Sequence, residues 1–516
     1  MTEQSQTKSS VKVAKSSDTM RAVEWHGTTD IRVNIKRPRP VIIKPNDAIV
    51  RITATTICES DLHLYHKEIP RVAKGDIMGH EGMGIIHEVG SQVLKHKIGD
   101  RVVISSVIAC GSCDYCKRAM FSCCNFTNSN DSSENVEKSL GTQAEYVRVP
   151  FADINLIQIS EEDNQILMEK ALLLSSVACK GLYACEMSKI LKGDVVGIWG
   201  ADAIGIMCAA WAKYLGASRV IVIDPIHSRL QVALKIERVE IINCKEDKDV
   251  VKKIKTSVPG GLDVAIDTVG IKYATRSFVG KLEKAFFADT ENCDALEEAI
   301  LCTKKGGNIS LIGDYNTFTN HFRIGAVMDK SLAIRGGKSH SRNFRDIILP
   351  IMCENNLFTS IFTHHMSLSE ATKAYKKLDK KEDGIIKILL IVDEKEFPHL
   401  TESSNSFPSG SRTRKIVETT SKNKPGKVVE AESGVIAMTV PSLFTEPINR
   451  SWSEPVYRSS FENNGLTQDT SISKSLDEVG SLKEEILAMS LNIKSDVDRN
   501  ELSEDGSHKK DEIKNE

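Results

Sequence analysis

Four cysteines lie close together with a spacing that suits a metal ion. Cys110, Cys113, Cys116 and Cys124 follow the pattern C-x2-C-x2-C-x7-C within the segment ACGSCDYCKRAMFSCC. Cysteines three residues apart in a loop can turn their sulfurs toward a common centre, and four thiolates complete the tetrahedral coordination of Zn²⁺ without an open position. The spacing therefore predicts a structural zinc site. Cys123 precedes Cys124 and could replace it if the register of the loop differs by one residue.

A second set of residues with the chemistry of a metal site lies upstream, in the segments TTICESDLHLYH and GDIMGHEGMG. Cys58 offers a thiolate and His80 an imidazole, the ligand types of a catalytic zinc ion, and Glu81 follows His80 directly. Ser60 and His63 come two and five residues after Cys58. There a hydroxyl could take a proton from an alcohol, and an imidazole could pass it to solvent.

A third pattern indicates a nucleotide site. The apolar run VVGIWG ends at Gly200, the following turn opens a helical pattern at Gly205, and the next apolar run ends at Asp224. In such a strand-turn-helix unit a pyrophosphate binds at the helix N-terminus, and an acidic residue about 20 positions on binds the adenosine ribose. Asp224 favours NAD over NADP because the 2′-phosphate of NADP would meet a carboxylate. Without a cofactor, the two glycines would still serve a tight turn and close helix packing.

These residues need two kinds of scaffold. The first part of the chain alternates apolar and polar residues over short segments bounded by turn residues, which is typical of β-strands. From about residue 167 the pattern changes to strand, helix and strand within about 30 residues, which predicts βαβ units and a parallel sheet. We expect strands at 48–52, 101–107, 195–200, 219–224, 263–267, 308–313, 331–337 and 387–392, and helices at 167–174 and after Gly205.

Together with GTQAEYVRVPFADINL, KKGGNISLIG and KKEDGIIKILL, these motifs resemble the zinc-dependent medium-chain alcohol dehydrogenases, and within them the formaldehyde dehydrogenase-like branch. The resemblance runs from about Met20 to about Asp393. It implies an α/β fold in which a GroES-like β-rich catalytic domain is interrupted by a Rossmann domain with a doubly wound parallel sheet. The implied divisions are a disordered tail at 1–19, the catalytic domain at 20–172 with its zinc lobe at 108–126, the Rossmann domain at 173–336, a return to the catalytic domain at 337–395, and a disordered tail at 396–516.

The resemblance also implies a role for each candidate residue. Two zinc ions per subunit are expected, a structural one at the four cysteines and a catalytic one at Cys58, His80 and Glu81. Ser60 and His63 would form the proton relay, and NAD(H) would carry the hydride. The residues expected to bind NAD(H) are Gly200, Gly205, Asp224, Arg229, Val269 and Gly270.

Three residues of the expected cleft depart from the family pattern. Asp202 replaces the glycine that lets the backbone approach the pyrophosphate. Two unit charges about 5 Å apart repel by roughly 3 kcal/mol at an effective dielectric near 20, unless the side chain turns away or a cation such as Arg229 offsets the charge. Glu59 stands where the family carries a small or basic residue facing the cofactor, and Ser176 stands where the family has the aspartate that is the third zinc ligand.

The replacement of that aspartate leaves the third ligand open. Glu81 or Cys179 could take its place, and Cys179 and Lys180 themselves stand where the family has proline and threonine. Two functions suit this pattern. The first is a NAD-dependent zinc oxidoreductase acting on a small alcohol or aldehyde hydrate, in a homo-oligomer; the alternative is a catalytically lapsed relative that keeps the fold and structural zinc for a binding or regulatory role.

The whole chain sets broader limits. Its 516 residues carry 68 Lys and Arg against 70 Asp and Glu, so the net charge of −2 gives no bulk attraction to nucleic acid or to an anionic membrane. The sequence contains no run of 18 apolar residues, the length needed to cross a bilayer, and its N-terminal segment lacks a secretion signal. We therefore expect a cytoplasmic location. The serine-rich segment from residue 397 onward is typical of a disordered tail, although the helical spacing at 482–493 would also suit docking to an unknown partner.

Overall fold

The computed structural model describes residues 19–68, 72–127, 141–159, 165–270, 293–315, 322–354 and 361–397. All of them belong to one structural unit, Met1–Arg412. Both predicted tails therefore lie outside the described residues, apart from Thr19, Glu396 and Phe397. No described helix has the length and apolar character needed to cross a bilayer.

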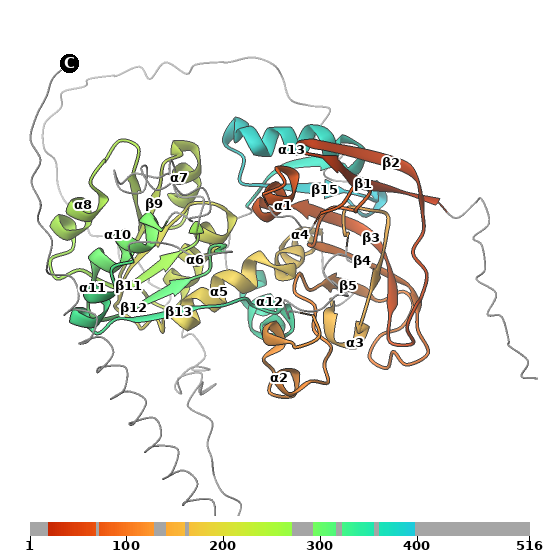
Figure 1. Ribbon diagram of the computed structural model, residues 1–516, viewed down its shortest axis with the longest axis horizontal. Coiled ribbons are helices and arrows are strands. Elements are labelled where there is room, and N and C mark those ends of the chain that lie inside the picture. Colours follow the sequence, from red (N-terminus) through yellow and green to blue (C-terminus); the bar gives the residue numbers. More distant parts are fainter. Residues whose placement is uncertain are drawn as a thin grey trace, which may run out of the picture. The chain divides into compact units, whose positions relative to one another are not determined.

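A six-stranded parallel sheet forms the centre of one half of the described structure (Figure 1). Every neighbouring pair in it is parallel, as expected for strands that alternate with helices. The order across the sheet is β10 (Val239–Asn243), β9 (Arg219–Asp224), β8 (Val195–Trp199), β11 (Leu262–Asp267), β12 (Thr303–Leu311) and β13 (Ala333–Gly336).

Strand β9 shows why this sheet is buried on both faces. Successive side chains of a strand point to opposite faces. Val220 and Val222 therefore join the apolar cluster that includes residues of helices α5 (Val177–Met187) and α6 (Ala203–Tyr214). Ile221 and Ile223 join the cluster that includes residues of α8 (Val250–Ser257) and α10 (Asp294–Cys302). Continuous apolar strands of this kind place their chemistry at the strand ends, where the turns lie.

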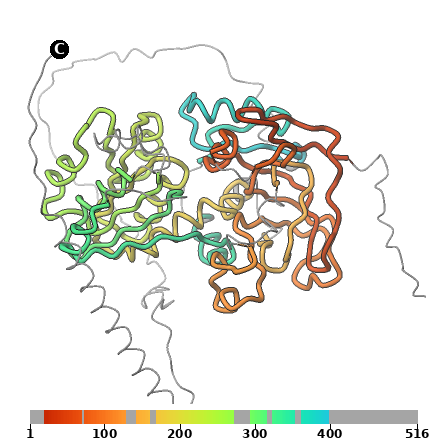
Figure 2. Tube along the Cα trace, viewed as in Figure 1, coloured from red at the N-terminus to blue at the C-terminus, as the bar shows by residue number. Residues whose placement is uncertain are grey.

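The second sheet has seven strands and is mostly antiparallel. Its order is β14 (Phe362–Ser367), β15 (Lys387–Ile391), β3 (Ala48–Ile57), β4 (Gly82–Val89), β5 (Arg101–Ile104) and β7 (Leu156–Gln158), and β6 (Tyr146–Val149) also pairs with β3. A hairpin of β1 (Thr19–Gly27) and β2 (Asp30–Pro38) is separate from it. The pairing of β15 with β3 brings the end of the described chain beside its beginning, and Figure 2 shows the blue and red segments meeting.

The remaining helices are short and connect or cover these sheets. They are α1 (Glu59–Tyr65), α2 (Asp114–Lys117), α3 (Ala152–Asn155), α4 (Gln165–Leu172), α7 (His227–Ala233), α8 (Val250–Ser257), α10 (Asp294–Cys302), α11 (Ile324–Lys330), α12 (Arg345–Glu354) and α13 (Ala371–Lys380).

The predicted fold class, a β-rich half and a parallel-sheet half, is confirmed. Several predicted elements have other bounds. The strand expected at 101–107 is β5, which ends at Ile104, and the helix expected at 167–174 is α4, which ends at Leu172 and is followed by a 3-10 turn over Leu173–Ser175. Ser176 then has φ −150° and ψ −66°, outside the helical region, so the chain changes direction before α5 begins. The predicted domain boundaries stay predictions.

Candidate metal and cofactor sites

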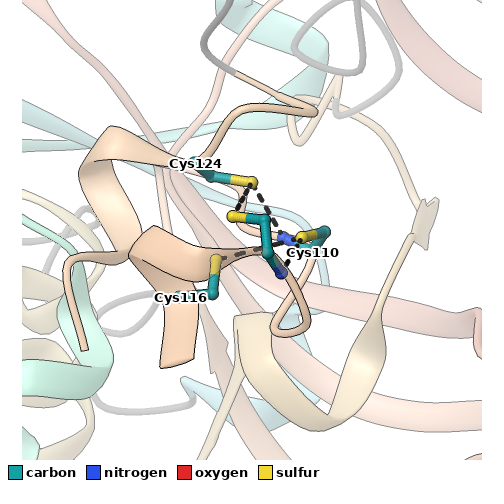
Figure 3. Close-up of side chains that lie close together, drawn as sticks. Cys110, Cys116 and Cys124 are labelled. Atoms are coloured by element: carbon teal, nitrogen blue, oxygen red, sulfur yellow. Dashed lines mark hydrogen bonds between the residues drawn. The ribbon is translucent and has the colours of Figure 1, made fainter. Parts of the chain in front are cut away.

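The four predicted cysteines meet in the loop that contains α2. Their sulfurs all lie within 4.8 Å of one another, with 3.9 Å between those of Cys110 and Cys116 and 4.0 Å between those of Cys113 and Cys124 (Figure 3). Zinc–sulfur bonds of about 2.3 Å in a tetrahedron place the sulfurs roughly 3.8 Å apart, so this arrangement fits Zn²⁺. Cys124 is buried whereas Cys123 is exposed, and it is Cys124 that joins the group.

Hydrogen bonds inside the loop prepare these sulfurs for a metal ion. The backbone N–H groups of Ser112 and Cys113 both donate to Sγ of Cys110 at 3.4 Å. Burial opposes a charged thiolate, yet hydrogen bonds from the backbone of Cys116 and Asn125 lower the pKa of Cys113 to about 6. Because zinc binds thiolates, a loop that stabilises the charged sulfur favours the metal.

Cys58, His80 and Glu81 form a second cluster in the described part of the chain, again with ligand atoms within 4.8 Å of one another. Cys58 follows β3 and begins α1, while His80 and Glu81 directly precede β4. Strands β3 and β4 pair antiparallel, with Thr55 opposite Gly82, so the end of one strand lies beside the start of the other. The sheet register thus brings the three residues together.

Asp61 supports two of these ligands at once. Its Oδ2 accepts the backbone N–H of Cys58 at 2.9 Å, and its Oδ1 lies 3.2 Å from Nδ1 of His80. Because the Asp61 carboxylate lies beside Nδ1, Nε2 of His80 is the nitrogen left for a metal ion. Burial works to lower the pKa of His80, but Asp61 and Cys58 raise it well above its usual value. The surroundings therefore favour positive charge at this position, which a divalent cation would also supply.

One carboxylate oxygen of Glu81 is held by neighbouring side chains, and the other lies toward His80. Its Oε2 accepts a hydrogen bond from Thr56 and lies 2.6 Å from Nζ of Lys387. Its Oε1 is buried, makes no hydrogen bond to the described residues and lies 3.9 Å from Nε2 of His80. Burial raises the pKa of Glu81, but Lys387 and His80 overcome this effect and lower it to about 2, so the side chain is an anion.

The two predicted relay residues lie on the same helix. Oγ of Ser60 is 3.4 Å from Nε2 of His80, which places the hydroxyl beside the cluster. His63 is one turn further along α1 and buried, and its Nδ1 pairs with a carboxylate oxygen of Glu68, whose side chain is 54% exposed. Residues three apart share a helix face, so Ser60 and His63 lie on one side of α1, and Glu68 follows the end of this helix.

The two candidates for the third ligand differ in their surroundings. Cys179 donates its S–H to the carbonyl oxygen of Leu174 at 3.1 Å, and burial raises the pKa of its thiol to about 12. Glu81, by contrast, belongs to the cluster. Oγ of Ser176, which stands in the place of the family aspartate, is buried and has no hydrogen-bond partner among the described residues. Lys180, one turn into α5, is a partly buried cation that interacts with the charges of Cys58 and Glu81.

The predicted nucleotide turn joins β8 to α6. Gly200 has φ +110°, and a Cβ there would stand 2.3 Å from Oγ1 of Thr268. A Cβ on Gly205 would stand 2.0 Å from the carbonyl oxygen of Gly200, so both positions require glycine. Val269 and Gly270, at the end of β11, donate their N–H groups to Oδ1 of Asp267. Val269 lies against the turn, since the Cβ built on Gly200 would be 2.8 Å from its Cγ2.

Acidic side chains surround this turn. Asp202 caps α6, because its Oδ1 accepts the N–H of Gly205 at 2.8 Å. Asp224 accepts the N–H groups of Ala201 at 2.8 Å and Ile226 at 2.7 Å, one on each oxygen. Burial is the largest cause that raises the pKa values of both carboxyl groups.

A buried arginine lies close to these acids. Arg229 of α7 makes an ion pair with Glu59, the residue after Cys58, and both side chains are largely shielded from water. Arg229 also interacts with the charges of Asp202 and Asp224, and burial, which would lower the pKa of its guanidinium, is outweighed by these three acids. Arg229, which we expected to offset the charge of Asp202, thus interacts with three carboxylates at once.

Comparison with known proteins shows the family of the chain. Residues 44–161 match the alcohol dehydrogenase GroES-like domain, and residues 203–285 match the zinc-binding dehydrogenase family. A zinc-type alcohol dehydrogenase-like protein of Schizosaccharomyces pombe is 36% identical over 387 residues, which cover 72% of this chain and 90% of that protein. The chain belongs to the zinc-dependent medium-chain alcohol dehydrogenase family.

Other members of the alcohol dehydrogenase family are similar at lower identity. A formaldehyde dismutase of Pseudomonas putida is 28% identical, and the aligned region covers 70% of this chain and 95% of that protein. The solved structure of the alcohol dehydrogenase TADH from Thermus sp. ATN1 is 29% identical with a TM-score of 0.62, covering 72% of this chain and all of its own. Members of this family are oxidoreductases that act on small alcohols or aldehydes.

The ligand sets fit the zinc that this alcohol dehydrogenase family binds. In the second cluster the test is the buried, unpartnered Oε1 of Glu81, which a cation beside Cys58 and His80 would satisfy. The residues at the nucleotide turn suit one part of a nicotinamide cofactor and oppose another part. Asp224 and the glycine turn suit its adenosine half, whereas Asp202 and Glu59 oppose its phosphates.

Sequence reasoning missed the residues that support the candidate ligands Cys58, His80 and Glu81. They are Thr56, Asp61, Gln143 and Lys387; Gln143 donates to the Thr56 carbonyl at 3.0 Å and to Asp61 at 3.3 Å, and accepts from Tyr375 at 3.0 Å. Gln143 and Lys387 lie within the motifs GTQAEY and GIIKILL, but their contacts depend on the pairing of β6 and of β15 with β3.

Proposed function

We propose that this protein is a zinc-dependent oxidoreductase that transfers a hydride between a small alcohol or aldehyde hydrate and NAD. The observation that carries the proposal is the cluster of Cys58, His80 and Glu81 with the Ser60 hydroxyl 3.4 Å from Nε2 of His80. Three protein ligands and one adjacent proton acceptor match a catalytic zinc site, in which the fourth position stays open for the substrate.

Each residue has a separate task in this mechanism. Zinc held by Cys58, His80 and Glu81 would supply Lewis-acid polarisation of the substrate oxygen. Asp61 fixes the His80 ring so that Nε2 faces the cluster, and Lys387 fixes Glu81 through Oε2 so that Oε1 does the same. Oγ of Ser60 accepts the hydroxyl proton of the substrate.

The proton then has a route out of the site along α1. Ser60 passes it toward His63, and the exposed Glu68 carboxylate, paired with Nδ1 of His63, lies at the solvent end. NAD would supply the hydride acceptor, with Asp224 at its adenosine ribose and the β8–α6 turn at its pyrophosphate. We also propose that the protein forms a homo-oligomer and is located in the cytoplasm.

The test is the zinc content of the full chain, together with NADH binding and alcohol-dependent NAD reduction. We expect two zinc ions per chain, falling to one in Cys58→Ser, with NADH binding retained in that variant. One zinc ion in both proteins, or no NADH binding at millimolar cofactor, would contradict the proposed activity.

A second candidate function is a catalytically lapsed family member that binds rather than converts a ligand. Three observations favour it: Asp202 caps α6, Glu59 holds Arg229, and Ser176 has replaced an anionic ligand. The triple variant Glu59→Gly, Ser176→Asp, Asp202→Gly distinguishes the two functions. A large gain of turnover from a negligible starting value indicates a lapsed site, whereas loss of an existing activity indicates that these residues serve the substrate of a working enzyme.

A further inference from the structure

The contact between Glu59 and Arg229 has a consequence for cofactor affinity. We propose that Glu59 is a specificity-determining residue of the nucleotide site: it competes with the phosphates of the cofactor for Arg229, and so makes the site discriminate against ligands according to their phosphate charge. This inference rests on the proposed use of NAD. It adds that binding of the pyrophosphate requires the Glu59–Arg229 pair to open.

The position of the pair supports this role. Glu59 begins α1, directly after the metal ligand Cys58, while Arg229 lies on α7, which follows the ribose-binding strand β9. The pair therefore connects the metal cluster with the nucleotide sheet. Only 6% of the Arg229 side chain and 19% of the Glu59 side chain are exposed, so water screens the interaction little.

The charges at the site do not balance. Glu59, Asp202 and Asp224 bring three negative charges when ionised, and Arg229 brings one positive charge, which leaves two negative charges. A pyrophosphate adds two more. A guanidinium binds phosphate well because it donates several hydrogen bonds in one plane, but here one of its donors, on Nη2, is already bound to the carboxylate of Glu59.

Asp202 acts in the same direction at the helix. Its carboxylate accepts the N–H of Gly205 at 2.8 Å, so one of the free N–H groups of α6 is satisfied by the chain itself. Both places that would stabilise a pyrophosphate, the helix N-terminus and the arginine, thus already hold an internal carboxylate. Of the two acids, Glu59 is the better one to change, because Asp202 also caps the helix.

The experiment compares the affinities of the full chain for adenosine, AMP, ADP and NADH by calorimetry. In the unaltered protein we expect affinity to fall from adenosine to ADP. In Glu59→Gln, which keeps the shape of the side chain but not its charge, we expect NADH and ADP to bind on the order of 10 to 100 times more tightly, while adenosine is little changed. A general loosening of the structure would not separate the ligands by charge.

Two further variants make the result specific. Glu237→Gln removes an 81% exposed carboxylate from the same half of the protein and should change no affinity. Adding Arg229→Gln to Glu59→Gln should cancel the gain for ADP and NADH, because the freed arginine is its source. If Glu59→Gln is poorly folded, Glu59→Ala gives the same comparison.

The outcomes separate this inference from the proposed function. Equal NADH affinity in the unaltered protein and in Glu59→Gln would overturn the inference and leave the NAD-linked function standing. Tighter binding in Glu59→Gln supports the inference even if the unaltered protein shows no turnover, which would then count against the function alone. Failure of every variant to bind NADH would overturn both.

Discussion

The two metal clusters differ in what holds their ligands in place. The four cysteines come from one loop, and backbone N–H groups of that loop stabilise their sulfurs. Cys58, His80 and Glu81 come from two strand ends, and they depend on Asp61 nearby and on Lys387 from the last strand of the described chain. Metal binding by a site built from one loop should be little affected by changes elsewhere in the chain. Metal binding by a site assembled from distant segments should weaken when any supporting contact is lost.

The largest expected effect comes from breaking the local cluster. Cys124→Ser should remove one zinc ion per chain and lower the free energy of unfolding by about 5 kcal/mol or more, because a structural zinc contributes its binding energy to folding. Elemental analysis and thermal unfolding measure the two changes. The matched control is Cys123→Ser, since this neighbour is exposed and lies outside the cluster. Loss of zinc from the control instead would show that the register of the loop is shifted by one residue.

Lys387→Met tests the dependence of the second cluster on a distant partner. Glu81 would lose its lysine partner in a buried place, and breaking such a buried pair lowers the free energy of unfolding by about 3 to 5 kcal/mol. Denaturant unfolding of the full chain measures it. Lys377→Met breaks the more exposed pair with Asp383, and it should change stability by less than about 1 kcal/mol. Similar losses in both variants would mean that burial does not distinguish the two pairs.

Ser176→Asp sharpens the comparison by restoring the anion that the family carries at this position. Oγ of Ser176 is buried without a partner, so a carboxylate there would be stabilised chiefly by a cation. We expect the second zinc to bind on the order of 10 to 100 times more tightly, measured by competition with a chelator. Ser176→Asn matches the aspartate in size but not in charge, and should give no such gain. Equal effects of the two variants would exclude an electrostatic origin.

The same contrast explains how far the sequence could be interpreted. The cysteine spacing and the strand-turn-helix pattern are local, so the structural zinc group and the turn at Gly200 could be predicted residue by residue. The partners of His80 and Glu81 could not, because Lys387 reaches Glu81 only through the pairing of β15 with β3. Glu59 could be recognised as unusual, but its pairing with Arg229 depends on how two separate sheets present their ends.

The smallest expected effect concerns the attachment of the cysteine loop to the rest of the protein. His340 is fully buried, its ring lies 5.1 Å from that of Phe121 in the loop, and its Nε2 is 3.1 Å from Oδ1 of Asn155. The same oxygen of Asn155 accepts the N–H of Ala109 at 2.9 Å, next to the first zinc ligand. Burial, aided by the charge of Arg342, lowers the pKa of His340 to about 3, so this link is uncharged.

This lowered pKa gives the sign of a pH effect. The unfolded chain takes up a proton at His340 near its usual pKa of about 6.5, while the folded chain resists it down to about pH 3. The contribution of His340 is therefore complete above pH 6.5 and is lost as the pH falls, by at most about 1.4 kcal/mol per pH unit. His340→Gln, which cannot be charged, should make the unfolding free energy less steep between pH 6 and 4. The exposed His87→Gln should not, and an unchanged slope in His340→Gln would mean that the loop is attached independently of this histidine.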